Sequence, residues 1–188
     1  MQADPSGDLV PGCCPQGVTS FFQDEIASSC NTRISDTPYR MFYSGNTTGK
    51  TITKISFTID QPMPVMPTGN SDCVDMDLAV LRLYLDPLAA SAVKTVQINK
   101  QNHNFAIKYE GQTYLEVQSG MLPSVAAQMD VGLTGVWTGD QVCNFKTSGS
   151  SVCSYVLEGK MVAGQYACCN TGDLLMSTVS QPVGFSSY

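Results

Sequence analysis

The sequence has little charge, and that charge is mostly of one sign. Charged residues make up 14% of the 188 residues, against roughly 25% in an average soluble domain. With 16 Asp and Glu against 10 Lys and Arg the net charge is -6, and no basic stripe alternates with aromatic residues. Such a chain would repel a phosphate backbone, so we predict no nucleic-acid partner.

The sequence also lacks a long hydrophobic run. No apolar stretch approaches the roughly 20 residues that a membrane-spanning helix needs, so we predict no membrane span. The first residues, Met1 to Asp8, show no basic region followed by an apolar core. We therefore expect either that a signal peptide has been removed or that the chain is a fragment.

Histidine is nearly absent, and the cysteines show no metal-binding pattern. Structural zinc sites usually contain Cys-x-x-Cys or Cys/His knuckles, and the sequence has none. The only histidine, His103, lies in a polar stretch before a predicted strand and is typical of a turn. A Cys-His nucleophile would need a free, exposed thiol, which an oxidised set of cysteines does not leave. We therefore predict no enzymatic activity and no cofactor.

Acidic residues offer two weaker alternatives. Asp72, Asp75 and Asp77 surround a cysteine and form a weak candidate site for Ca²⁺, which prefers several oxygen ligands from one loop. Their spacing does not match an EF-hand, and solvated loop acids are the ordinary interpretation. The two carboxylates of a glycoside hydrolase need be neighbours only in space, so a secreted hydrolase stays open as the least favoured function.

Cysteine, in contrast, is abundant. Eight cysteines form an even set in a sequence rich in Thr and Ser, which favours an oxidising compartment and predicts that all eight form disulfides. They are Cys13, Cys14, Cys30, Cys73, Cys143, Cys153, Cys168 and Cys169. We therefore expect an extracellular protein.

One local bridge can be predicted among the 105 pairings that eight cysteines allow. Cys143 and Cys153 flank Asn144 to Val152, a Thr/Ser/Gly-rich stretch that can turn back on itself. A bridge between these two cysteines is therefore plausible. In each adjacent pair, 13–14 and 168–169, the two cysteines are expected to bond to different partners, because neighbouring side chains rarely reach the required torsion without strain.

Hydrophobic and polar residues alternate in several short segments, with the period of a half-buried strand. These segments are Ile55 to Ile59, Leu81 to Leu85, Val96 to Ile98, Phe105 to Tyr109, Leu115 to Val117 and Met129 to Leu133. Turn signals lie at Ser44 to Asn46, Glu110-Gly111, Thr138 to Asp140 and Ser148-Gly149. Many short strands without a long amphipathic helix predict a mostly β fold, an antiparallel β-sandwich or distorted barrel stapled by disulfides.

We predict one or two short helices. Ser20 to Gln23 resembles a capping box, so one helix is expected from about Phe21 to Ser28. Asp86 and Pro87 are typical of a helix start and predict one or two turns through Ala92. The predicted regions are a flexible lead-in with the first helix at 1–29, a β domain at 30–170 and a C-terminal tail at 171–188.

Two surface features can be predicted outside the strands. Pro62, Pro64 and Pro67 cannot join a sheet interior, so the segment Gln61 to Asn70 is a predicted exposed contact loop. Asn46 begins the only glycosylation sequon, Asn-Thr-Thr, and lies in a predicted turn.

Four aromatic residues could form a sugar-stacking platform. They are Tyr39, Tyr43, Tyr84 and Trp137. Aromatic residues at strand positions lie more often in the core, and we expect Trp137 to continue the strand of Met129 to Leu133 as a core residue.

Four sequence segments occur in a characteristic order. They are Cys30-Asn-Thr-Arg33 followed by Thr37-Pro38-Tyr39-Arg40-Met41, then Cys73-Val-Asp-Met-Asp77-Leu78, then Gly139-Asp140-Gln141-Val142-Cys143, and last Cys153-Ser-Tyr-Val-Leu157 with Cys168-Cys169. In this order they resemble the pherophorin domain of green-algal extracellular matrix and cell-wall glycoproteins, over most of the chain. The chain departs from the family pattern in two places: it has one cysteine before Asp-Leu where the family often has two, and it has Cys-Cys-Asn instead of Cys-Cys-Pro.

The resemblance implies an extracellular structural or interaction module of an algal cell wall, a matrix or a ciliary surface filament. Such a module would bind other matrix or surface glycoproteins, with polysaccharide as a second partner. Two alternatives stay open, a carbohydrate-binding (lectin-like) domain and a secreted signalling glycoprotein. A lectin-like domain would show an exposed aromatic residue beside Asn or Asp side chains.

Overall fold

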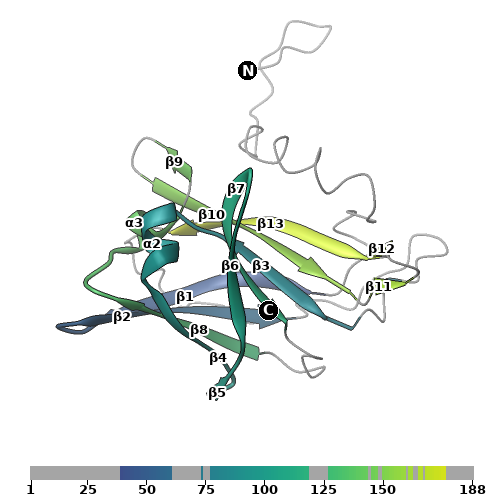
Figure 1. Cartoon of the computed structure of the whole chain (residues 1–188), viewed down its shortest axis with the longest axis horizontal. Coiled ribbons are helices and arrows are strands. Elements are labelled where there is room, and N and C mark those ends of the chain that lie inside the picture. The colour runs from purple at the N-terminus through teal and green to yellow at the C-terminus, as the bar shows by residue number, and fades with distance from the viewer. Residues whose placement is uncertain are drawn as a thin grey trace, which may run out of the picture.

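The protein folds as two facing antiparallel β-sheets (Figure 1). The computed structural model describes residues 39–60, 73, 77–118, 127–143, 145–147, 150–159, 161–162, 165–166 and 168–176. The predicted helix at 21–28, the prolines at 62, 64 and 67, Asp72, Asp75 and the cysteines at 13, 14 and 30 lie outside these residues.

The first sheet has five strands in the order β1-β2-β8-β4-β5. Its strands are β1 (Arg40–Thr48), β2 (Ile52–Asp60), β8 (Ala127–Thr134), β4 (Val93–Ile98) and β5 (Gln101–Asn102). Every neighbouring pair is antiparallel. We call it the five-stranded sheet.

The second sheet has six strands in the order β13-β10-β3-β7-β6, with β9 paired to β10. They are β13 (Cys169–Met176), β10 (Ser150–Glu158), β3 (Val80–Tyr84), β7 (Gln112–Gln118), β6 (Phe105–Glu110) and β9 (Phe145–Thr147). A separate small hairpin pairs β11 (Met161–Val162) with β12 (Gln165–Tyr166). The β13 strand continues past residue 170 into the region predicted as a tail.

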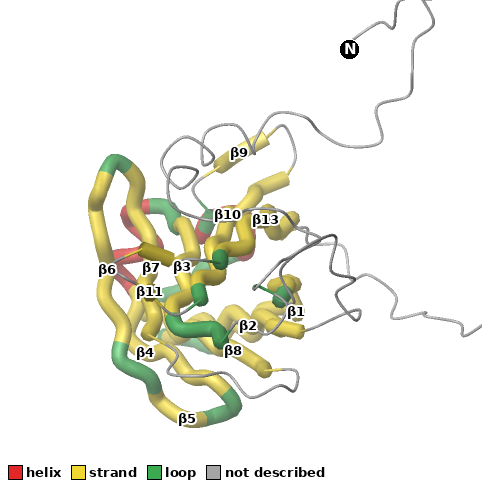
Figure 2. Tube along the Cα trace, turned by 90° about the vertical axis from the view of Figure 1, so that its right-hand side faces the viewer, coloured by secondary structure: helices red, strands yellow, loops and turns green. Residues whose placement is uncertain are grey.

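The sheets stack as two layers, with β1, β2 and β8 in one and β3, β10 and β13 in the other (Figure 2). The predicted antiparallel sandwich is therefore confirmed, and the sheets do not close into a barrel. The alternation of apolar and polar residues explains why the two sheets stack, because one face of each strand is apolar. Ile55, Phe57 and Ile59 of β2 are at most 2% exposed. Each such burial contributes about 1.5–3 kcal/mol relative to exposure.

A tyrosine connects the two layers at one end of the core. Tyr155 of β10 is 5% exposed, and its hydroxyl accepts a hydrogen bond from the Met41 N–H of β1 at 3.3 Å. Its cross-strand neighbour is Gly172 of β13. A Cβ built on Gly172 would lie 2.5 Å from the Tyr155 hydroxyl oxygen, so only glycine leaves room for the ring. Burial raises the pKa of the Tyr155 hydroxyl.

Disulfides cross-link this framework. Cys143 and Cys153 are bonded, which confirms the predicted local bridge. Cys73 is bonded to Cys168 across 95 positions of sequence. Cys169 is also disulfide-bonded, and because Cys73 holds Cys168, the two adjacent cysteines have different partners as predicted.

Two short helices connect strands. The predicted start at Asp86 and Pro87 is confirmed, since α2 spans Pro87–Ala92 and the Asp86 carboxylate accepts the Leu88 N–H at 2.9 Å. The predicted turn at Thr138 to Asp140 instead begins α3 (Gly139–Val142). The Gln141 side chain accepts the Thr138 N–H at 3.0 Å, which satisfies one free amide of that first turn.

Three local predictions are wrong. The predicted turn at Ser44 to Asn46 lies inside β1, because the pairing with β2 continues on both sides of a bulge at Ser44, and Gly45 next to it has a φ of 136°. Tyr109, expected on the buried face of its strand, is 65% exposed near the end of β6. Trp137 does not continue β8, which ends at Thr134, and its indole N–H donates to the Thr134 carbonyl at 2.8 Å.

Candidate interaction surface

The outer side of the five-stranded sheet carries mostly polar side chains, and we call the ten polar residues given below the polar face. It follows from the alternation of β2 and β8, where the odd-numbered residues fill the core and the even-numbered ones face outward. Its residues are Ser44 and Thr47 of β1, Lys54, Ser56 and Thr58 of β2, Gln128 and Asp130 of β8, Thr95 and Gln97 of β4, and Asn102 of β5.

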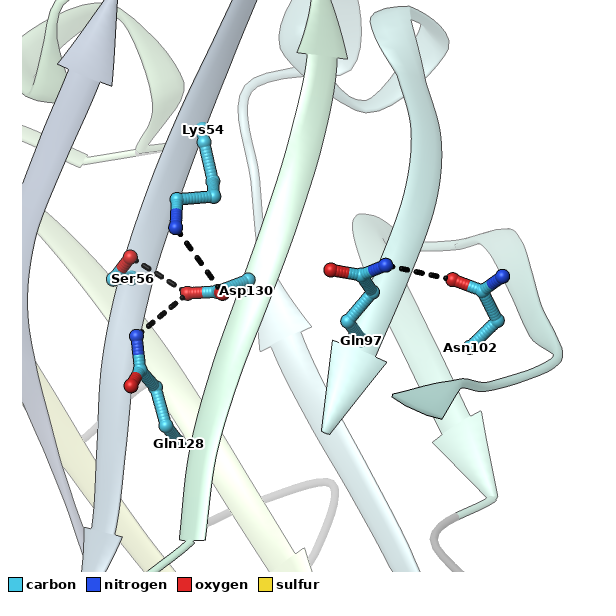
Figure 3. Close-up of polar contacts among 6 residues, drawn as sticks. All are labelled: Lys54, Ser56, Gln97, Asn102, Gln128 and Asp130. Atoms are coloured by element: carbon cyan, nitrogen blue, oxygen red, sulfur yellow. Dashed lines mark hydrogen bonds and ion pairs between the residues drawn. The ribbon is translucent and has the colours of Figure 1, made fainter. Parts of the chain in front are cut away.

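Asp130 is the centre of this face (Figure 3). Its side chain is only 12% exposed, and three neighbours donate to it. Ser56 Oγ and Gln128 Nε2 donate to Oδ1 at 2.7 and 3.1 Å, and Lys54 Nζ donates to Oδ2 at 3.3 Å. Burial alone would raise the pKa of Asp130, but these hydrogen bonds and the lysine charge lower it overall. The carboxylate is therefore ionised and its charge is balanced by Lys54.

The register places four polar side chains side by side across four strands. Ser56 lies opposite Asp130, Asp130 opposite Gln97, and Gln97 opposite Asn102. The amide of Gln97 donates to Asn102 Oδ1 at 2.9 Å (Figure 3). Neighbouring strands lie about 4.8 Å apart, so this cross-strand row extends over roughly 15 Å. It offers donors and acceptors in alternation along its length.

A phenylalanine borders the polar face. Phe42 of β1 is 46% exposed and lies opposite Thr58, which in turn lies opposite Gln128. Thr58 and Ser44 share a hydrogen bond between their hydroxyls at 2.6 Å. An exposed aromatic ring therefore lies in the next row of side chains to the carboxylate and amides of the cross-strand row.

The outer side of the six-stranded sheet has a different character. Arg82 of β3 forms ion pairs with Glu116 of β7 at 3.1 Å and with Glu158 of β10 at 2.8 Å. Its guanidinium also lies 5.5 Å from the ring centroid of Tyr114. Burial lowers the pKa of Arg82, but Glu158 and then Glu116 raise it overall. These charges bond to one another and hold three strands in register.

The four aromatic residues that could have formed a sugar-stacking platform do not do so. Tyr39 and Tyr84 are each 6% exposed, so neither ring can stack on a ligand. Tyr43 packs edge to face on the core ring of Phe57, and Trp137 packs partly buried against the core. The exposed aromatic at the polar face is Phe42, which the sequence analysis did not select. The exposure of Phe42 could have been predicted from the alternation within β1, where Met41 points inward and Phe42 outward.

The remaining predicted site residues lie apart from this surface or beyond the described region. His103 lies between β5 and β6, outside any strand, and its N–H donates to the Val96 carbonyl at 2.9 Å. Asp77 is partly buried, and no group of three potential metal ligands occurs among the described residues. Asn46 is exposed on β1. Within the described part of the chain, no helix is long and apolar enough to cross a membrane.

Comparison with known proteins identifies one family and several distant folds. The pherophorin family profile matches residues 22–170, well over half of the chain. No match is found among curated proteins. The structure is similar to BslA, a bacterial hydrophobin, with a TM-score of 0.38 and 10% identity over 76% of this chain and 96% of that one.

Two further solved structures share a comparable likeness. The collagen-binding domain of a Staphylococcus aureus adhesin has a TM-score of 0.33 and 7% identity, over 73% of this chain and 96% of that one. A GH20 exo-β-N-acetylglucosaminidase from Vibrio harveyi has a TM-score of 0.35 and 11% identity, over 78% of this chain but only 19% of the enzyme. Likeness at these levels carries no argument about function.

Proposed function

The chain belongs to the pherophorin family, and from this premise we propose that it is an interaction module of an algal cell wall, extracellular matrix or ciliary surface filament. Pherophorins are matrix glycoproteins, which makes an extracellular matrix module the function of the family. The match over residues 22–170 is the observation that carries the proposal. In this role the module binds other matrix or surface glycoproteins, with polysaccharide as a second partner, and catalyses no reaction.

The covalent framework supports an extracellular role. Cys73–Cys168 and Cys143–Cys153 both lie within the sandwich, and such bonds persist in oxidising compartments. A disulfide limits the unfolded chain and typically adds about 2–4 kcal/mol. This stability suits a protein that must last outside the cell without chaperones. We extend the proposal to all eight cysteines.

Three further features form part of the proposal. Asn46 is exposed on the edge strand β1, so a glycan at this sequon would project from the sheet edge without disturbing the core. The segment 61–70 with Pro62, Pro64 and Pro67 remains a proposed contact loop. The acidic residues 72, 75 and 77 remain a weak proposal for calcium.

A fractionation experiment tests the matrix role. An epitope-tagged chain is secreted from a green alga, and medium, extracellular matrix and cells are separated and probed. We expect the tag in the matrix fraction, cross-linked by a short bifunctional reagent to other matrix glycoproteins. The same protein after reduction and alkylation, added from outside, is the control and should not be retained. Recovery of the native protein free in the medium, without cross-links, would refute the matrix role and favour a diffusible signal.

A further inference from the structure

The polar face presents hydrogen-bonded polar side chains beside an exposed aromatic residue. We propose that it binds a neutral polysaccharide chain, which stacks on Phe42 and hydrogen-bonds to the cross-strand row of Ser56, Asp130, Gln97 and Asn102. The inference rests on the proposed matrix function and names one partner of the module and its contact surface. Its evidence is independent of the family match, since it comes from register, exposure and hydrogen bonding.

The polar groups of this face are already ordered before a ligand arrives. Asp130 is held by Ser56, Gln128 and Lys54, and Gln97 is held by Asn102. Ordering flexible side chains is one of the main entropic costs of binding. That cost is small here because these side chains are already held by hydrogen bonds in the folded protein. Each sugar hydroxyl both donates and accepts, and the row supplies carboxylate and carbonyl acceptors beside amide and hydroxyl donors.

The charge of the face selects a neutral ligand. Among its ten residues, the Asp130 carboxylate is balanced by Lys54 at 3.3 Å, so this set carries no net charge. The chain as a whole has a net charge of -6, which repels an anionic polysaccharide at long range. A protein partner is less well matched, because protein interfaces depend on buried Trp, Tyr and Arg anchors and none of the ten residues of the polar face is of these types.

Phe42 supplies the apolar contact that such a ligand needs. Its ring is 46% exposed beside Thr58, and leaving a large apolar side chain in water has a cost that stacking would remove. The C–H face of a pyranose ring is apolar and packs on the π face of an aromatic residue. Since Thr58 lies two residues from Ser56 on β2, a ring stacked on Phe42 is adjacent to the cross-strand row.

Binding to defined polysaccharides tests the inference. The oxidised, purified full chain is incubated with curdlan, cellulose and mannan as neutral probes and with polygalacturonate as the anionic comparison. We expect retention on at least one neutral probe and none on polygalacturonate. Phe42→Ala and Gln97→Ala should each weaken binding by about tenfold, which corresponds to about 1.4 kcal/mol. Phe42→Tyr should retain binding because it keeps the ring.

Tyr109→Ala is the matched control. Tyr109 is also an aromatic side chain on a strand and 65% exposed, but it belongs to the six-stranded sheet. The inference predicts unchanged binding for this variant. A flat result on every neutral probe, or loss of binding with Tyr109→Ala but not with Phe42→Ala, would overturn it.

The result of this binding test can be distinguished from the result of the fractionation test of the matrix role. Cross-linking to matrix glycoproteins without polysaccharide binding would refute this inference and leave the proposed function standing. Failure in both experiments would refute the function itself. Circular dichroism and an unchanged thermal midpoint show for each variant that the loss is not caused by unfolding.

Discussion

Replacing Gly172 by alanine tests how tightly the two sheets are packed around Tyr155. The new methyl group would lie 2.5 Å from the Tyr155 hydroxyl oxygen and 2.6 Å from the ring carbon that bears it. The ring has no free space to enter, because Tyr155 is 5% exposed and its hydroxyl is bonded to the Met41 N–H. Either β13 must move away from β10 or the ring must leave its site.

Three effects determine the change in the free energy of unfolding, two unfavourable and one favourable. Overpacking a core costs about 1–3 kcal/mol, and loss of the hydrogen bond to Met41 would add about 0.5–1.5 kcal/mol. Alanine in place of glycine in a strand regains about 0.5–1 kcal/mol. We therefore expect Gly172→Ala to lower the free energy of unfolding by about 1–3 kcal/mol. For a chain of this length each kcal/mol lowers the thermal midpoint by about 2–4 °C.

Denaturant unfolding with intact disulfides is the assay, and Gly139→Ala is the control. A methyl group on Gly139 would meet Met176 at 3.5 Å and Tyr43 at 3.6 Å, which is ordinary contact, so this variant should unfold almost as the wild type. In a Tyr155→Leu background the cost of Gly172→Ala should largely disappear. Equal stability of the Gly172 and Gly139 variants, or an undiminished cost in that background, would refute the proposed steric origin.

Three further predictions concern charge and disulfides. In the folded protein the pKa of Asp130 lies below its ordinary value of 3.8. The ionised carboxylate therefore stabilises the fold above pH 3.8, and this contribution is lost as the pH falls through the folded pKa. The denaturant midpoints of the wild type and of Asp130→Asn should converge at low pH. The entropy that a disulfide removes from the unfolded chain is worth about 4.7 kcal/mol for a loop of 95 positions and about 2.7 kcal/mol for a loop of 10. Replacing Cys73 and Cys168 by alanine should therefore destabilise the fold more than replacing Cys143 and Cys153, as measured by thermal melts. The reverse order would contradict this model. Mass mapping of the unreduced protein should find no free thiol among the eight cysteines, and any stoichiometric thiol would contradict the proposed set of bridges.

Much of the fold could be predicted from local patterns. Alternation identified β2, β3 and β8, because a strand buried on one face needs apolar residues at every second position. Asp86 and Pro87 located α2, since capping depends only on adjacent residues. The Cys143–Cys153 bridge was predictable because the chain between the two cysteines is short and β9 turns back onto β10.

One error comes from pairing between distant segments and another from a single glycine. Ser44 to Asn46 has the composition of a turn, but β1 pairs with β2 on both sides of this segment, and the extra residue, Ser44, forms a bulge. Trp137 follows β8 too closely to be distinguished from a strand residue by pattern alone, and the positive φ of Gly135 ends the strand. In β1 the local preference for a turn was overridden by long-range hydrogen bonding to β2.

The candidate surface was the least predictable part. The cross-strand row exists only because β2, β8, β4 and β5 pair in one particular register, and a shift of one residue would turn Asp130 into the core. No local signal relates Ser56 to Asn102. Phe42 was predictable in orientation once Met41 was placed inside, but its neighbours were not.

The pairing of early and late strands has a mechanical consequence. β1 contacts β13, and the Asn170 amide donates to the Tyr39 carbonyl, so the two ends of the sandwich meet at one edge. Tension applied to the two ends of the chain cannot stretch the segment between Cys73 and Cys168 beyond the disulfide that joins them. The extension of the module under load therefore has a covalent limit.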